Sequence, residues 1–518
     1  MYSAMPTACA GARSAERPGA NVVTGTKPEY NWNYQSEPMT GLNGRSVYWA
    51  QGRIVGGSSS INGMMYVRGK SRDYDGWGID GWRYADVLPL FRRSETNERG
   101  ESALHGASGP LQVSIGRSTA PVCELFLDAA EQAGYARTGD LNAEQDREAF
   151  GHVDMTIGKG RRSSAASAFL RPALRRPNLT LVAQAQVTRV LIEKGVARGV
   201  EYLHRGQRMT VRATREVVLA GGAVNSPQLL MLSGIGPAAH LREHGLAVVA
   251  DRPGVGENLQ NHPMYRILHA TTKPVSAYSH LSPRGLITAG WQYAFGRRGL
   301  LSRGLFPTSG FLYAEDGRPE TEIQVSMAPA LVIRRRPGVI GTLPKEHGFT
   351  LLLNHGSHYS RGRVRLKSAD PLAHAAIDPN YFSDPRDITI LAKGAERVRD
   401  MLRRPAFAPV LGREIQPKGP INSRADIEAD IRATTITHYH PGGTCRMGVD
   451  DDAVVDPELR VRGVEGLRVA DASIMPVMIN GNTYAAAMMI GEKAAELING
   501  GCASRAPGRR DAAPPKGN

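Results

Sequence analysis

The chain has 518 residues, of which 41% are hydrophobic and 22% charged, so it can bury a large core in two or more domains or in one interleaved fold. No uninterrupted apolar run of about 18 residues occurs, so a transmembrane helix is not expected. Lys and Arg outnumber Asp and Glu by 64 to 49, but no recognition motif accompanies this charge, so nucleic-acid binding is not expected.

Residues 1–29 are predicted to be an irregular segment. They lack the continuous apolar core of a secretory signal, and they contain neither an apolar strand nor a G-x-G-x-x-G pattern. Four widely spaced cysteines without a C-x-x-C pair favour a reducing compartment, so we expect a cytoplasmic protein. The excess of positive charge leaves peripheral contact with a membrane surface open.

The stretch GRIVGGSSSINGMMYVRG, residues 52–69, gathers glycines and serines into one loop. Several backbone N–H groups and hydroxyls lie close together in such a loop, and such a nest suits an anionic or strongly accepting ligand. A flexible turn is the alternative interpretation.

The stretch GWGIDG, residues 76–81, spells out the dinucleotide-binding pattern G-x-G-x-x-G. It follows the polar run SRDYD instead of a strand, and Trp77 is poorly suited to a backbone that must approach a phosphate. We interpret it as a glycine turn before a helix over WRYADVLPLF, with Asp80 as the expected N-cap.

Short apolar runs further along the chain predict four buried strands, which alternate with helical segments. The strands are expected at residues 179–183, 188–193, 216–222 and 467–473, and the helices at residues 226–234 and 485–500. The first of these helices is expected to open at Asn225, Ser226 and Pro227. The pattern predicts a mixed α/β fold, and residues 501–518, rich in Pro, Gly and charge, are expected to form a disordered tail.

Six long motifs occur in a fixed order between about Tyr30 and Gly500. They are GRIVGGSSSINGMMYVRGKSRDYD (52–75), GGAVNSPQLLMLSGIG (221–236), PGVGENLQNH (253–262), YHPGGTCRMG (439–448), LRVADASIMP (467–476) and NGNTYAAAMMIGEKAA (480–495). In this order they resemble the glucose-methanol-choline (GMC) family of FAD-dependent oxidoreductases. The branch that they resemble most comprises choline dehydrogenases and related alcohol dehydrogenases.

The resemblance implies an FAD-binding, Rossmann-like domain interleaved with a substrate-binding domain built on an antiparallel sheet. The FAD-binding domain is expected at residues 30–75, 182–262 and 434–500, and the substrate-binding domain at residues 76–181 and 263–433. The family's dinucleotide fingerprint lies in a first βαβ unit, which is missing from residues 1–29. Because that unit supplies the main phosphate anchor, we expect the chain as written to bind FAD weakly or not at all, and a chain extended upstream to bind it.

Oxidation of an alcohol by a flavin requires a base for the hydroxyl proton, a group that orients the substrate and hydride transfer to flavin N5. The resemblance places His440 and Asn482 in the family's catalytic pair, with His440 as the base and Asn482 bonded to the substrate oxygen. His438 lies two residues earlier in a strand-like run, so we expect it to face the other way and to have a structural role.

The resemblance also implies a set of contacts with FAD. These residues are Gly56, Gly57, Ser58 and Asn62 at the flavin and phosphates, Val187 at the adenine with Ala220 and Gly221 beside it, Asp471 and Ala472 at the pyrophosphate and ribityl chain, and Thr483 at the pyrimidine edge. Some family members attach FAD through a histidine in the loop, where this chain has Ile61 and Asn62, so a noncovalent FAD is expected. No metal site is expected.

The expected substrate is a small-molecule alcohol, which is oxidised to an aldehyde. The segment TEIQVSMAPALVI, residues 321–333, is expected to help line the substrate cavity, and it shows no acidic and aromatic cage for a quaternary ammonium. The sequence therefore does not favour choline over other alcohols, and it leaves open whether the electron acceptor is a quinone, a dye-type acceptor or oxygen. The alternatives are a hydroxynitrile-type lyase on the same fold and an N-terminally truncated, inactive remnant.

Overall fold

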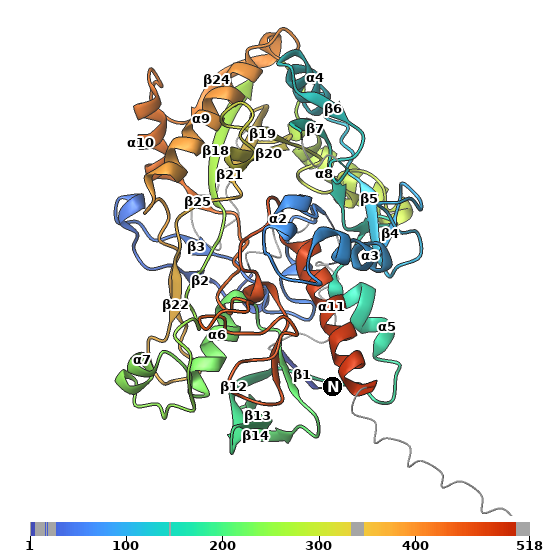
Figure 1. Ribbon diagram of the computed structural model, residues 1–518. Helices are drawn as coiled ribbons and strands as arrows, with labels where there is room; N and C mark the ends of the chain where they lie inside the picture. The colour runs from blue at the N-terminus through green and yellow to red at the C-terminus, as the bar shows by residue number, and fades with distance from the viewer. Residues whose placement is uncertain are drawn as a thin grey trace, which may run out of the picture.

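The computed structural model describes residues 2–5, 16, 18, 27–143, 147–332 and 346–503. It contains two packed bodies (Figure 1). The upper body is built on a large sheet covered by helices, and the lower body surrounds helices α6 (Gly222–Leu232) and α11 (Tyr484–Ala503). Each body has its own apolar core, and both cores draw residues from distant parts of the chain. The chain therefore passes between the bodies several times, as the interleaved fold predicts.

The large sheet runs in the order β24-β18-β21-β20-β19-β7-β6, and β25 also pairs with β18. The strands are β6 (Ala136–Thr138), β7 (Ala149–His152), β18 (Pro263–Thr271), β19 (Thr308–Tyr313), β20 (Glu322–Ala328), β21 (Gly348–His355), β24 (Leu411–Gln416) and β25 (Ile436–Thr437). Its neighbours are antiparallel except for β6 and β7, which are parallel. This confirms that one of the two bodies is built on a largely antiparallel sheet, as expected.

The three central strands β19, β20 and β21 are buried along their whole length. Their apolar side chains are covered because helix α9 (Pro385–Leu402) packs on β21, while α4 (Val122–Gln132) and α10 (Arg424–Thr434) pack against α9. Asp384 caps the start of α9, since its side chain accepts a hydrogen bond from the backbone N–H of Arg386. The sheet is thus a rigid wall, which positions the polar side chains on its strands.

The lower body contains the strands that the sequence predicts. They are β11 (Thr180–Ala183), β12 (Ala185–Glu193), β15 (Val217–Leu219) and β26 (Leu467–Val469). β15 and β26 are parallel neighbours, while β12 forms an antiparallel sheet with β13 (Val196–His204) and β14 (Gln207–Arg212). The predicted C-terminal helix is α11, which continues to Ala503, and residues 504–518 of the expected tail lie outside the described residues.

Two element starts differ from the sequence-based predictions. Helix α6 begins at Gly222, four residues before the predicted start, and Pro227 lies inside it. Helix α3 (Tyr84–Ser94) begins with Arg83 as its N-cap instead of Asp80. In α3 the side chain of Asp86 accepts the backbone N–H of Arg83, so the helix supplies its own capping partner.

The N-terminal residues also differ from the expectation of an irregular segment. Residues Tyr2–Met5 form strand β1, which pairs in parallel with β11. The composition of this stretch did not indicate a strand. The prediction that GWGIDG is a glycine turn agrees with the structure, since Gly78 and Gly81 have positive φ angles and the indole of Trp77 donates to the carbonyl of Val477.

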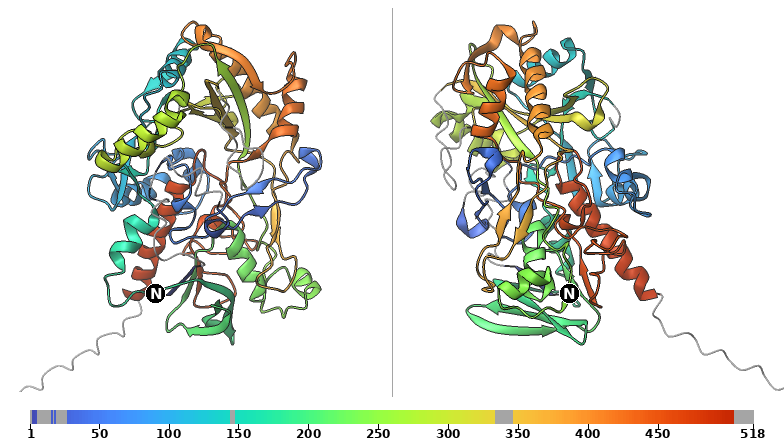
Figure 2. Two further views of the ribbon diagram at one scale, coloured as in Figure 1. Left: turned by 180° about the vertical axis from the view of Figure 1, so that it is seen from behind. Right: turned by 60° about the vertical axis from the view of Figure 1, so that its left-hand side comes forward.

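The remaining elements are short, with one exception. They are β2 (Tyr34–Gln35), β3 (Tyr48–Trp49), α2 (Ser71–Asp75), β4 (Glu95–Asn97), β5 (Leu111–Ile115), β8 (Asp154–Met155), β9 (Ile157–Gly158), β10 (Arg161–Arg162), α5 (Arg171–Ala173), β16 (Ile235–Gly236), α7 (Ala238–Glu243), β17 (Ala250–Asp251), α8 (Pro283–Gly296), β22 (Arg363–Arg365) and β23 (Ala376–Asp378). The longest of these elements is α8, which lies at the edge of the molecule (Figure 2).

Within the described ranges, no helix has both the length and the apolar character needed to cross a membrane.

Candidate active site

The predicted pair of His440 and Asn482 meets where the two bodies join. His440 lies in the loop after β25, and Asn482 lies just before α11. The two side chains are buried, and the Nδ2 atom of Asn482 is 3.3 Å from the Nε2 atom of His440. The backbone N–H of His440 donates to the side-chain oxygen of Asn261 at 2.9 Å, which holds the loop in place. The structure therefore brings together two residues that are 42 positions apart.

A chain of hydrogen bonds defines which nitrogen of His440 carries the proton. The amide of Gln324, on β20, donates to the Oδ1 atom of Asn482 at 3.1 Å, so the NH₂ group of Asn482 faces His440. The Nε2 atom of His440 must then accept, which places the proton on Nδ1. That Nδ1 atom is 3.2 Å from the Nδ1 atom of His262, which accepts the proton's hydrogen bond. The basic lone pair of His440 is consequently on Nε2, next to Asn482.

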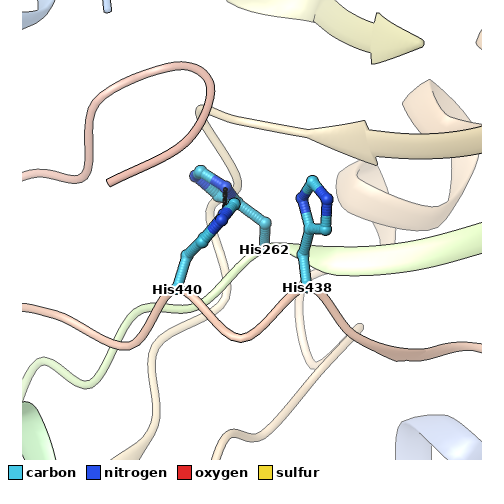
Figure 3. A group of neighbouring side chains, drawn as sticks. All are labelled: His262, His438 and His440. Carbon is cyan, nitrogen blue, oxygen red and sulfur yellow. Dashed lines mark hydrogen bonds between the residues drawn. The ribbon is translucent and has the colours of Figure 1, made fainter. Parts of the chain in front are cut away.

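Three imidazoles form a cluster at this point (Figure 3). The ring of His440 lies 5.3 Å from the ring of His262 and 4.3 Å from the ring of His438, centre to centre. One nitrogen from each ring lies within 4.8 Å of the others, a spacing within reach of metal coordination. The 3.2 Å contact between His262 and His440 is accounted for by the hydrogen bond that orients the base.

The position of His438 corrects the prediction that it faces away from His440. In a regular strand, residues two positions apart lie on the same face, so even an extended backbone would have placed the two rings on one side. Tyr439, between the two histidines, has a φ of 65° and so breaks the strand. The rings of His438 and His440 pack against each other and therefore share one environment.

Burial keeps the cluster neutral. Desolvation lowers the pKa of His262 to about 3 and the pKa of His438 to about 4. Desolvation also lowers the pKa of His440 well below 6.5, and the neighbouring His438 and His262 lower it further. His440 is therefore an uncharged imidazole at neutral pH, with a lone pair that can accept a proton.

Several buried polar atoms of residues near the pair have no hydrogen-bond partner among the described residues. These atoms are Oε1 of Gln324, both amide atoms of Asn354 and Nδ1 of His438. Gln324 and Asn354 are register partners on β20 and β21, so their side chains come from the same part of the sheet. Unsatisfied buried polar groups are costly, and a polar molecule beside the pair would supply the partners that they lack.

The predicted cofactor loop forms a tight turn followed by helix η4 (Gly57–Ser60). Gly56 and Gly57 both have positive φ, and a Cβ atom on Gly57 would meet nothing within 4 Å, so the loop borders open space. The guanidinium of Arg162 donates to Oδ1 of Asn62 at 2.6 Å and to its carbonyl at 2.9 Å. Burial lowers the pKa of Arg162 to about 10, which still leaves a positive charge beside the loop at neutral pH. This is a suitable environment for an anionic group.

Asp471 joins the second part of the predicted cofactor site. Its Oδ2 atom accepts from the backbone N–H of Gly222 at 2.9 Å and from the hydroxyl of Ser226 at 2.6 Å. The carboxylate thus caps α6 from the loop after β26, which explains why the helix begins earlier than its own sequence predicts. Ala220 and Gly221 lie at this helix start, and the carbonyl of Ala472 accepts from Gly443 at 3.2 Å, close to the His440 loop.

The two parts are connected through the start of α11. The hydroxyl of Tyr484 donates to the carbonyl of Ser163, next to Arg162, and Thr483 lies between Tyr484 and Asn482. Ser58 is exposed to solvent at the loop. Val187 lies on β12, in the sheet that packs against α6. The structure groups all of the predicted residues around the junction of the bodies except Val187, whose contact with the adenine stays a prediction, as do the cofactor contacts of the others.

Sequence reasoning missed two residues that hold the pair. His262 is the last residue of the motif PGVGENLQNH. Its position directly before the buried strand β18 could have indicated a buried, functional histidine. Gln324 belongs to the segment predicted to line the substrate cavity, where its polar side chain interrupts an apolar run. Residue 333 of that segment lies outside the described residues.

Comparisons with known proteins show which proteins the chain is similar to. Residues 8–264 and 358–491 match the N-terminal and C-terminal family models described as GMC oxidoreductase. The chain is 44% identical to the mitochondrial choline dehydrogenase of Homo sapiens over 491 residues, which cover 93% of this chain and 81% of that protein. It is 45% identical to the oxygen-dependent choline dehydrogenase of Sinorhizobium medicae over 476 residues, which cover 91% of this chain and 86% of that protein.

Solved structures show the same fold. Pyridoxine 4-oxidase from Mesorbium loti superposes with a TM-score of 0.84 at 31% identity, covering 96% of this chain and 93% of that one. A formate oxidase structure superposes with a TM-score of 0.89 at 24% identity, covering 97% of this chain and 94% of that one, which concerns the fold alone.

Proposed function

The chain belongs to the GMC oxidoreductase family, and we propose that its substrate is a small alcohol of the choline type. It is an FAD-dependent oxidoreductase that acts on the CH–OH group of an alcohol and forms an aldehyde. The proposal for the chemistry depends mainly on one observation, which is the lone pair of a neutral, buried His440 beside the NH₂ group of Asn482. The choline-type substrate is supported by the similarity to two choline dehydrogenases.

In the proposed mechanism the substrate hydroxyl enters between His440 and Asn482. Its oxygen accepts a hydrogen bond from Nδ2 of Asn482, and its proton passes to Nε2 of His440, which acts as the general base. Gln324 keeps the amide of Asn482 in the donating orientation, and His262 keeps the other proton of His440 on Nδ1. When bound, FAD supplies the hydride acceptor at N5.

The residues at the junction fit an FAD molecule in two respects. Gly57 and Gly222 both border open space, since a Cβ atom on either would meet nothing within 4 Å. The positive charge of Arg162 and the backbone N–H groups of the Gly56 loop suit an anionic group. We propose that Gly56, Gly57, Ser58, Asn62, Ala220, Gly221, Asp471, Ala472 and Thr483 hold the cofactor noncovalently, with Val187 beside the adenine.

One acidic residue of the segment predicted to line the substrate cavity is not available to a quaternary ammonium. Glu322, on β20, is fully buried and forms ion pairs with Arg72 at 2.9 Å and Lys70 at 3.9 Å. A cationic substrate would therefore need a partner other than this carboxylate. The substrate class must be tested with choline and with neutral primary alcohols side by side.

The test uses the purified chain, titrated with FAD and freed of oxygen. Bleaching of the flavin absorbance on addition of choline supports a choline-type oxidoreductase, while bleaching only with neutral alcohols supports the reaction but overturns the substrate. A bound flavin that no alcohol bleaches, together with release of an aldehyde from a cyanohydrin, would instead indicate a lyase. His440→Ala is expected to lower the rate of flavin reduction at least about tenfold.

A matched control exists for that variant. His269 is another buried histidine, which lies on β18 outside the histidine cluster. Its Nδ1 atom is 3.3 Å from the carbonyl oxygen of Gly412. His269→Gln should keep the reduction rate of the unmodified protein. Unchanged kinetics in His440→Ala, with bound flavin preserved, would remove His440 from the role of base.

A further inference from the structure

Helix α8 (Pro283–Gly296) has a large apolar surface that nothing in the described part of the chain covers. Four of its side chains are exposed: Leu286 at 49%, Ile287 at 64%, Trp291 at 63% and Phe295 at 78%. Its main packing partners are the short helices that flank it, η6 (Ala277–Leu281) and η7 (Leu300–Ser302). Exposed apolar patches on this scale are uncommon on soluble surfaces and mark contacts with other molecules.

The apolar side chains form a continuous stripe along one face of α8. Ile287, Trp291 and Phe295 follow one another at intervals of four residues, which places them in line on a helix. The rings of Trp291 and Phe295 are stacked with their centres 4.6 Å apart, so they present one aromatic surface. The helix stands at the edge of the molecule (Figure 2), and the side chains of the stripe are exposed to solvent.

Positive charge surrounds the stripe at both ends. Arg284 precedes it, Arg297 and Arg298 follow it, and the sequence contains no Asp or Glu between Glu257 and Glu315. Among the described residues, no carboxylate forms an ion pair with Arg284, Arg297 or Arg298, so their charges are directed to solvent.

A basic cavity adjoins the C-terminal end of the helix. It has a volume of about 490 Å³ and its lining includes five basic residues and one acidic residue. The basic residues are Arg117, Lys159, Arg297, Arg298 and Arg303, and the acidic residue, Glu98, is paired with Arg117. The cavity therefore offers unneutralised positive charge beside the aromatic stripe. Neither His440 nor Asn482 lines it.

We propose that α8 and this cavity form a docking surface for the anionic face of a phospholipid bilayer. The stripe of Ile287, Trp291 and Phe295 enters the boundary between headgroups and acyl chains, where indole and phenyl rings are favoured. The arginines at its ends, with the cavity, hold the phosphate groups of anionic headgroups. The protein thus lies on the membrane without spanning it. Two signals, apolar and electrostatic, act together, which a stable peripheral contact requires.

The experiment measures binding of the full chain to vesicles by co-sedimentation. Vesicles of phosphatidylcholine containing phosphatidylglycerol should bind the protein, and vesicles of phosphatidylcholine alone should bind it at least about tenfold more weakly. The double variant Trp291→Ser with Phe295→Ser should lose at least about tenfold in affinity for the anionic vesicles. A control double variant at exposed apolar residues of other segments, Leu372→Ser with Val449→Ser, should bind as the unmodified protein does.

Two further variants separate the two signals. Arg297→Gln with Arg298→Gln should weaken binding to anionic vesicles about tenfold and should remove most of its salt dependence. Trp291→Phe keeps an aromatic anchor, so it should keep binding while losing the blue shift of tryptophan emission that vesicles cause. All of these positions are exposed, and none belongs to the catalytic pair or the cofactor residues, so flavin reduction in solution should not change.

Three outcomes would overturn the proposal. The first is failure of the unmodified protein to bind anionic vesicles. The second is equal binding by the Trp291→Ser, Phe295→Ser variant. The third is a concentration-dependent dimer that this variant dissociates while vesicles are ignored, which would assign the α8 face to a second copy of the chain.

Discussion

Replacing His262 by phenylalanine should slow flavin reduction without preventing cofactor binding. His262 accepts the hydrogen bond from Nδ1 of His440, and its loss leaves a buried N–H group without a partner. Such a loss costs about 1–3 kcal/mol, which corresponds to roughly a fivefold to 150-fold lower rate if the cost falls on the reactive tautomer. In the other tautomer the proton sits on Nε2, where it blocks transfer from the substrate.

The assay is anaerobic stopped-flow reduction of the FAD-loaded protein by its alcohol substrate, with the rate expressed per bound flavin. The limiting rate should fall in His262→Phe, while the substrate concentration that gives half of this rate should change little. His262→Gln retains an acceptor oxygen and should recover part of the rate, and His269→Gln, on β18, should keep all of it. A limiting rate in His262→Phe equal to that of the unmodified protein would refute the proposed tautomer control.

Three other predictions concern the same junction. Gln324→Leu removes the donor that orients Asn482, so flavin reduction should slow by about tenfold in the stopped-flow assay, and an unchanged rate would show that the amide orients itself. Asp471→Ala removes the cap of α6 and should weaken FAD binding by about tenfold in a fluorescence titration, whereas wild-type affinity would contradict its role. Lowering the pH below 6.5 should lower the thermal unfolding midpoint, because unfolded histidines bind protons there while folded His262 and His438, with pKa values of about 3 and 4, do not. Their stabilising contribution is complete above pH 6.5, and each histidine should cost about 2 kcal/mol by pH 5, so a midpoint that stays flat from pH 7 to pH 5 would contradict their burial as neutral groups.

The sequence identified those parts of the site that lie in continuous motifs. The predictions of His440, Asn482, the glycine loop and Asp471 come from such motifs, and the structure brings His440 and Asn482 together, while the roles of all four stay predictions. The strands β11, β12, β15 and β26 could be predicted because each is a short apolar run with a clear boundary. These features depend on neighbouring residues in the chain, which a single sequence records directly.

Other features depend on contacts between distant segments, and these escaped prediction. The early start of α6 results from a carboxylate 249 residues away, and the orientation of Asn482 results from Gln324, 158 residues away. Such effects arise only after the two bodies have assembled.

The cap that Asp471 provides for α6 has a consequence for the order in which the protein matures. Ser226 and the carboxylate that it contacts are separated by 245 residues, so a ribosome must make most of the chain before the two can meet. Until then the N-terminal turn of α6 lacks its capping partner, and Asn482 has not yet been synthesised. We therefore expect a nascent chain that ends before residue 471 to be unable to hold FAD, and loading of the cofactor to follow release of the completed polypeptide.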